Sequence, residues 1–185
     1  HKEPTSDKFM KKRMALTLAF FAAIFCGALF LYYFSYQRTE LMGKKTVEDV
    51  INENEHRLTA RLDNDFENAG VTFPPKELAF LVLKEEKKLE LWARNDGGWK
   101  MVKAVAITAA SGKSGPKLRE GDRQVPEGVY ELVGLNPNSS YHLSMKLNYP
   151  NEFDRYWANK EGRTNPGSDI FIHGKAVSIG CIAVG

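Results

Sequence analysis

The longest apolar run of the chain lies near its N-terminus. Residues 14–36 contain no charged side chain, and a helix of this length crosses a hydrocarbon core of about 30 Å. A basic cluster precedes the run and tyrosines lie at its far end, as is typical of an anchor whose N-terminus is cytoplasmic; these residues are Lys8, Lys11, Lys12, Arg13, Tyr32, Tyr33 and Tyr36. The pattern predicts a cytoplasmic segment at 1–13, a transmembrane anchor at 14–36 and an exported remainder.

A cleaved signal peptide is the alternative for this segment, because a charged start followed by an apolar stretch is also its pattern. Bulky Tyr and Phe residues occupy the place where small residues should precede a cleavage site, which favours an uncleaved anchor. A lipid-modified Cys26 is disfavoured, since Phe25 stands where a small residue is needed.

Residues 46–69 have apolar positions at helical spacing between charged ones. The apolar residues recur at intervals of three, four or seven, and they are Val47, Val50, Ile51, Leu58, Leu62 and Phe66. Gly70 is a helix stop and Pro74 and Pro75 favour an extended segment after it. We predict a helical stem or linker over 37–76.

From residue 77 the pattern changes to that of strands separated by Gly, Pro, Asn and Ser. The predicted strands are 78–83, 89–93, 99–108, 128–133, 140–147 and 169–173. The fold class is therefore mainly β: one domain at 77–185, preceded by the transmembrane helix and the helical stem.

Charge and length limit the function classes. The chain has 185 residues, 26 Lys and Arg against 23 Asp and Glu, and a net charge of +3 that is partly local to the N-terminus. This is one domain with an extension, and its charge is too small and too evenly spread to predict a nucleic-acid partner.

The two cysteines lie far apart in the sequence. Cys26 falls in the apolar segment and Cys181 near the other end, so a bridge within the chain is not expected. A lone thiol in an exported, oxidising compartment indicates a reactive residue or an intermolecular partner. The alternative is a small buried hydrophobic residue.

Cys181 has neighbours suited to thiol chemistry. His173 can take the thiol proton, and Gly174 and Gly180 let peptide N–H groups approach a substrate carbonyl. A structural histidine with a buried cysteine is an equal alternative on the residues alone. Two possible ligands with seven residues between them are too few for a metal site even with His142, so no metal or cofactor is predicted.

Three blocks of the sequence resemble a known family. They are IFIHGKAVSIGC at 170–181, SGKSGPKLREGD at 111–122 followed by VPEGVY at 125–130, and YPNEFD at 149–154. In order, they resemble the L,D-transpeptidase (YkuD-like) catalytic domain, in the branch with a short interval from His to Cys. That branch includes murein L,D-transpeptidases and an endopeptidase that releases wall-bound lipoprotein. The resemblance runs from about Phe80 to Gly185.

The resemblance implies an L,D-transpeptidase-like β-sandwich in which Cys181 is the nucleophile and His173 its proton acceptor. Gly180 and Cys181 would form part of the oxyanion hole, and Ser178 would shape the loop. Ile179 stands where the main branch often has a second histidine. The family continues beyond the position of Gly185, so the sequence is expected to end before the domain does.

The resulting hypothesis is acyl transfer on peptidoglycan stem peptides by an inner-membrane, single-pass enzyme with its catalytic domain in the periplasm. The acceptor is a stem amine, a lipoprotein lysine or, in a hydrolytic endopeptidase, water. Arg119 is favoured among the loop cations for gripping a stem carboxylate, and His142 and Tyr149 are further candidates for substrate contact. The alternatives are a non-enzymatic envelope scaffold and, since no resolving cysteine lies near Cys181, less favourably a thiol redox protein.

Overall fold

The computed structural model describes residues 23–34 and 43–185. Residues 23–34 are helical and belong to a different unit from residues 45–185. Residues 14–22 and 35–36 of the predicted anchor and the predicted cytoplasmic segment 1–13 lie outside the described residues. Within the described ranges, none of the helices has both the length and the apolar character that crossing a membrane requires.

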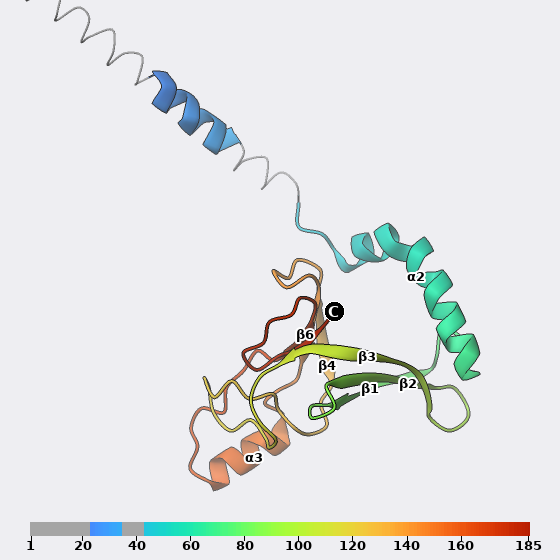
Figure 1. The fold of residues 1–185 in the computed structure, drawn as a ribbon. Coiled ribbons are helices and arrows are strands. Elements are labelled where there is room, and N and C mark those ends of the chain that lie inside the picture. The colour runs from blue at the N-terminus through green and yellow to red at the C-terminus, as the bar shows by residue number, and fades with distance from the viewer. Residues whose placement is uncertain (1–22, 35–42) are drawn as a thin grey trace, which may run out of the picture. The chain divides into compact units, whose positions relative to one another are not determined.

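The predicted stem helix is confirmed as α2 (Val47–Ala69). Thr46 caps its start in a reciprocal pair of hydrogen bonds with Asp49, and Gly70 ends it in the left-handed conformation with φ 63°. Phe66 is buried at its C-terminal end, which lies against the β1–β3 half of the sheet (Figure 1). Because burying an aromatic ring is strongly favourable, this contact fixes the C-terminal part of α2 on the domain.

The start of α2 is held by a second contact. The side chain of Asn138 accepts a hydrogen bond from the Lys45 amide at 2.9 Å and donates one to the Lys45 carbonyl at 2.7 Å. Asn138 lies in the loop between the fourth and fifth strands. The helix is therefore connected at its two ends to different parts of the domain.

Seven strands form the sheet (Figure 1), which confirms the mainly β class. They are β1 (Glu77–Leu83), β2 (Lys88–Arg94), β3 (Lys100–Ala110), β4 (Leu132–Asn136), β5 (Ser144–Leu147), β6 (Phe171–His173) and β7 (Ile182–Val184). Their order is β1-β2-β3-β7-β6-β5-β4, and only β6 and β7 pair in parallel. The last strand of the chain is thus inserted beside β3.

The expected sandwich of two sheets is wrong, because all seven strands are hydrogen-bonded neighbours in one sheet. The reason is the length of β3. Its first part pairs with β2 as far as Ala106, and its last part pairs with β7 from Ile107 to Ala110, with a register shift between Ile107 and Ala109. One strand of 11 residues therefore serves both halves.

The structure shortens or shifts the three later predicted strands. The strand expected at 128–133 is β4, which begins at Leu132. β5 begins at Ser144 and not at 140, because His142 and Leu143 have φ of 57° and 59°, a left-handed conformation that cannot continue a strand. β6 begins two residues after Asp169, whose φ is 55°.

Two elements were not predicted at all. β7 has three residues. Helix α3 (Glu152–Lys160) is capped by Asn151, whose side chain and that of Asp154 form a capping box. Both elements are short, and α3 buries only Ala158, so neither has a long hydrophobic pattern that sequence could display.

The main core lies under the central strands. Its buried members are Leu89, Ile107, Val125, Leu147, Tyr149, Ile170, Ile172 and Ile182. Ile172 and Ile182 are paired across β6 and β7. Each is next in sequence to a candidate site residue, His173 or Cys181, so the core fixes the backbone on which those side chains stand.

Candidate active site

One groove brings together the ends of several strands and loops. It has a volume of about 1080 Å³ and is lined by residues from 117–123, 136–144, 168–173 and 177–181. His173 and Cys181 both line it. In the part of the chain that the structure describes, no three His, Cys, Asp or Glu side chains are grouped so as to hold a metal ion.

His173 is the last residue of β6 and is only 5% exposed. Its Nδ1 lies 2.6 Å from the carbonyl oxygen of Gly174. Because a carbonyl oxygen can only accept, Nδ1 must carry the hydrogen, which leaves Nε2 with its lone pair in the neutral ring. The Tyr141 ring lies against the imidazole, with centroids 4.8 Å apart and planes inclined by 35°.

Gly174 is required by close backbone contact. A Cβ atom at this position would lie 2.8 Å from the carbonyl oxygen of His142 and 3.0 Å from that of Tyr141. Such contacts exclude any side chain without a shift of the backbone. Gly174 therefore lets the loop that carries Tyr141 approach His173, and its own carbonyl orients the imidazole.

Cys181 lies immediately before β7. Its thiol is 3.8 Å from the carbonyl oxygen of Asp169, and within the described residues no hydrogen bond joins it to His173. Burial raises the pKa of the Cys181 thiol above 9.0; the Phe171 amide and the Lys117 charge lower it by less, and the Asp169 charge raises it further. At neutral pH the thiol is therefore protonated, and it needs a base in order to react.

Ser178 holds the turn that carries the thiol. Its hydroxyl donates to the Cys181 carbonyl at 2.7 Å and accepts from the Ser111 amide at 3.1 Å and the Gly180 amide at 3.3 Å. The Gly180 amide, predicted to help form an oxyanion hole, thus points at Ser178. The loop-shaping role of Ser178 stays a prediction.

Ser111 is a site residue that sequence reasoning did not single out. Its hydroxyl donates to the Arg123 carbonyl at 2.7 Å and lies 3.0 Å from the Ser178 hydroxyl oxygen. The sequence feature that could have identified Ser111 is its position as the first residue of the block 111–122. Ser111 therefore links the loop that ends at Arg123 to the turn before Cys181.

The three residues expected to contact substrate do not line this groove. Arg119 lines a neighbouring polar groove of about 960 Å³. His142 lines an apolar cavity of about 390 Å³ beside the start of α2. Tyr149 is buried in the core, where its hydroxyl donates to the Pro166 carbonyl at 2.7 Å. Arg123 and Lys117 are the basic residues that do line it.

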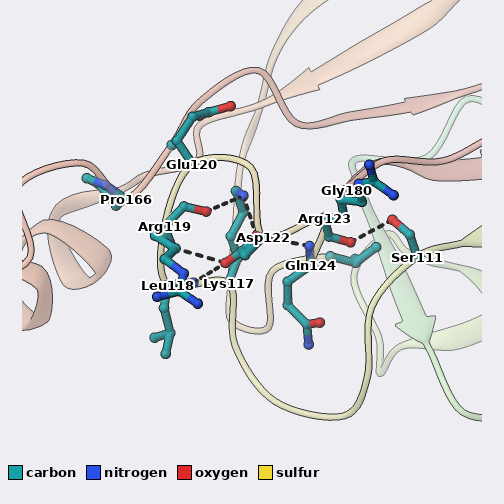
Figure 2. A network of polar contacts seen from close by, with 12 residues as sticks. Ser111, Lys117, Leu118, Arg119, Glu120, Asp122, Arg123, Gln124, Pro166 and Gly180 are labelled. Atoms are coloured by element: carbon teal, nitrogen blue, oxygen red, sulfur yellow. Dashed lines mark hydrogen bonds and ion pairs between the residues drawn. The ribbon is translucent and has the colours of Figure 1, made fainter.

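A charged network shapes the loop on one side of the groove (Figure 2). One oxygen of Asp122 accepts from the amides of Leu118 and Arg119, and the other accepts from the Gln124 amide and from the buried Lys117 ammonium at 2.7 Å. Partial burial opposes ionisation of Asp122, but the ammonium and the amides together outweigh it and hold the pKa of the carboxyl well below 3.8. The loop 117–124 is therefore fixed around one carboxylate.

Fold, groove and motif together define a class of protein. The family model of the YkuD L,D-transpeptidase catalytic domain matches residues 78–185. This match covers more than half of the chain, so the chain belongs to the L,D-transpeptidase catalytic domain family, as its three sequence blocks predicted.

Particular relatives are similar over the same region. YafK of Escherichia coli K12, a candidate L,D-transpeptidase, is 34% identical over 105 residues, which are 56% of this chain and 40% of that protein. YafK of E. coli O157:H7 gives the same values. The chain thus spans well under half the length of these curated relatives.

Two solved structures are also similar. The helical cell shape determining protein Pgp2 of Campylobacter jejuni is 28% identical, with a TM-score of 0.46 over 65% of this chain and 46% of that one. Bd1075 of Bdellovibrio bacteriovorus is 27% identical, with a TM-score of 0.41 over 61% of this chain and 41% of that one.

Proposed function

We propose that the domain catalyses acyl transfer on peptidoglycan stem peptides through a thioester on Cys181. One observation carries the proposal: in a chain of this family, the Cys181 thiol and a histidine whose Nδ1 is fixed on Gly174 line the same groove. Nε2 of His173 is then the base that such a thiol requires.

The first half-reaction follows from these groups. Nε2 of His173 takes the proton of Sγ as Sγ attacks the carbonyl carbon of the third, diamino-acid residue of the stem. The C–N bond to the fourth residue breaks, and the protonated His173 gives its proton to the departing amine. The product is a thioester on Cys181 and a neutral imidazole.

The second half-reaction releases the acyl group. An acceptor amine attacks the thioester carbonyl, the C–S bond breaks, and the proton of the amine returns through His173 to Sγ. A stem amine gives a cross-link, a lipoprotein lysine gives an anchored lipoprotein, and water gives hydrolysis. Anchoring through residues 14–36 and a periplasmic location belong to the same proposal and rest on the sequence pattern.

Intact-mass spectrometry tests the thioester. The purified protein is incubated with a disaccharide-tetrapeptide and, separately, with a carbapenem, and we expect an adduct with each that is absent in Cys181→Ala. Analysis of the released products then separates transfer from hydrolysis. No adduct from a folded protein whose Cys181 is open to alkylation would overturn the enzyme proposal and favour a non-enzymatic envelope scaffold.

The Tyr141 ring should contribute to thioester formation through its contact with His173. We expect Tyr141→Leu to lower kcat/KM for thioester formation by up to about tenfold, because an aromatic contact of this kind is worth about 0.5–1.5 kcal/mol. Tyr141→Phe keeps the ring and should retain nearly full activity. If the Phe variant were as impaired as the Leu variant, the hydroxyl and not the ring would be the important group.

A further inference from the structure

Four charged side chains line the groove that contains Cys181, and three of them are already engaged. They are Lys117, Glu120, Arg123 and Asp169. Lys117 pairs with Asp122, Asp169 pairs with Lys146 at 2.7 Å, and Glu120 accepts from the Ser168 amide at 3.2 Å. The Arg123 side chain is exposed and makes no hydrogen bond or ion pair with the described residues. Its guanidinium is the charge left for a ligand.

The backbone of Arg123 is held in an unusual conformation. Its φ is 57°, in the left-handed region that residues other than glycine rarely adopt. The Ser111 hydroxyl holds its carbonyl at 2.7 Å, and the flanking Gln124 amide is bound by Asp122 (Figure 2). A glycine would adopt this turn more easily, so the arginine occupies it against its conformational preference.

The position of Arg123 is tied to that of the thiol. Ser111, which holds the Arg123 carbonyl, also contacts the Ser178 hydroxyl at 3.0 Å, and Ser178 holds the Cys181 carbonyl. Gly180 lies beside Arg123, since a Cβ built on it would be 4.0 Å from the Arg123 carbonyl carbon. A ligand group gripped by Arg123 would therefore be placed in a fixed relation to Sγ.

We propose that Arg123 is the carboxylate-binding residue of this groove and that it sets the position of the stem peptide over Cys181. A guanidinium binds a carboxylate through two parallel hydrogen bonds. This inference rests on the proposed function, under which the ligand carries two carboxylates, one at the C-terminus of the tetrapeptide and one on the side chain of its third residue. Arg119, which the sequence favoured for this role, lines the other groove.

Arg123→Gly is the most direct variant, because glycine removes the guanidinium and suits the left-handed backbone. We expect it to raise KM for the disaccharide-tetrapeptide by about 10- to 100-fold with little change in kcat, as for the loss of a hydrogen bond to a charged group that forms in both ground and transition states. Arg123→Lys keeps the charge without the planar guanidinium, so its KM should lie between those of the wild type and Arg123→Gly. Arg119→Ala, an exposed arginine of the same loop, is the matched control and should behave as wild type.

Amidated substrates identify the carboxylate. One substrate has its C-terminal carboxylate amidated and another has the side-chain carboxylate of the third residue amidated. Amidation of the carboxylate that Arg123 binds should raise the KM of the wild type as much as Arg123→Gly raises it for the unmodified substrate. The same amidation should not raise the KM of Arg123→Gly any further.

Two results would overturn the assignment. One is a KM of Arg123→Gly equal to that of Arg119→Ala; the other is that both amidated substrates raise the KM of Arg123→Gly further, and by the same factor. Either result counts against the assignment only when the wild-type protein forms the thioester. Absence of the thioester in the wild type is instead the failure of the proposed function.

Discussion

Replacement of His173 by alanine is expected to lower the rate of thioester formation on Cys181 at neutral pH by about 10²- to 10⁴-fold, the usual contribution of a general base. The reason is the protonated thiol. Because burial raises the pKa of Cys181 above 9.0, little thiolate exists at neutral pH, and the histidine must remove the proton during the attack. The rate of mass-adduct formation with the tetrapeptide measures the loss.

The pH dependence of the same variant gives an internal control. The thiol loses its proton only as the pH rises toward its raised pKa, so the rate of the alanine variant should rise steadily above neutral pH. Alkylation of Cys181 at high pH should be equally fast in wild type and variant, since the thiolate then forms without a base. Equal acylation by both proteins at neutral pH would mean that His173 is not the base.

Asp122→Asn is expected to lower the free energy of unfolding by about 3–5 kcal/mol, as for the loss of one partner of a buried ion pair. The Lys117 side chain is 4% exposed and that of Asp122 15%. Each carboxylate oxygen accepts two hydrogen bonds. An amide has only one oxygen, so its NH₂ group would face two donors and the Lys117 charge would lose its counterion. Denaturant unfolding at neutral pH measures the difference.

The pH dependence of this stability has a defined sign. Because the folded pKa of Asp122 lies below its usual 3.8, its contribution is complete above that value and is lost as the pH falls through the folded pKa. The difference in the free energy of unfolding between wild type and Asp122→Asn should therefore narrow only in strong acid. Asp96→Asn is the control, since Asp96 pairs with Lys76 in an exposed bridge and should cost less than about 1 kcal/mol. An equally small effect for Asp122→Asn would show that the network is not stabilising.

The N-terminal half of the described domain was predictable because its signals are local. Helix α2 has a repeated apolar spacing, a capping threonine and Gly70, and β1 to β3 are long runs separated by polar turns. The C-terminal half was not, because its boundaries depend on residues such as His142 and Asp169 that adopt positive φ. Tertiary contacts and not composition select that conformation.

The residues of the candidate site also divide into those that could be predicted from the sequence and those that could not. His173 and Cys181 could be found because their motif is short and continuous in sequence. Arg119 was favoured from the sequence and Arg123 was not considered, because only the turn around Asp122 decides which of them lines the groove. Tyr149 was expected at the substrate, but its ring is apolar enough to join the core and its hydroxyl finds backbone carbonyl partners there. No local pattern separates these outcomes.

The double pairing of β3 makes the two halves of the sheet a single cooperative unit. The strand that pairs with β2 is the same strand that pairs with β7, directly after Cys181. Opening of the β1–β2 hairpin therefore weakens the pairing that supports β7, the strand that follows Cys181, although the hairpin contributes no residue to the groove. Substitutions in β1 or β2 would reduce activity in proportion to the unfolded fraction, without altering the chemistry of the molecules that remain folded.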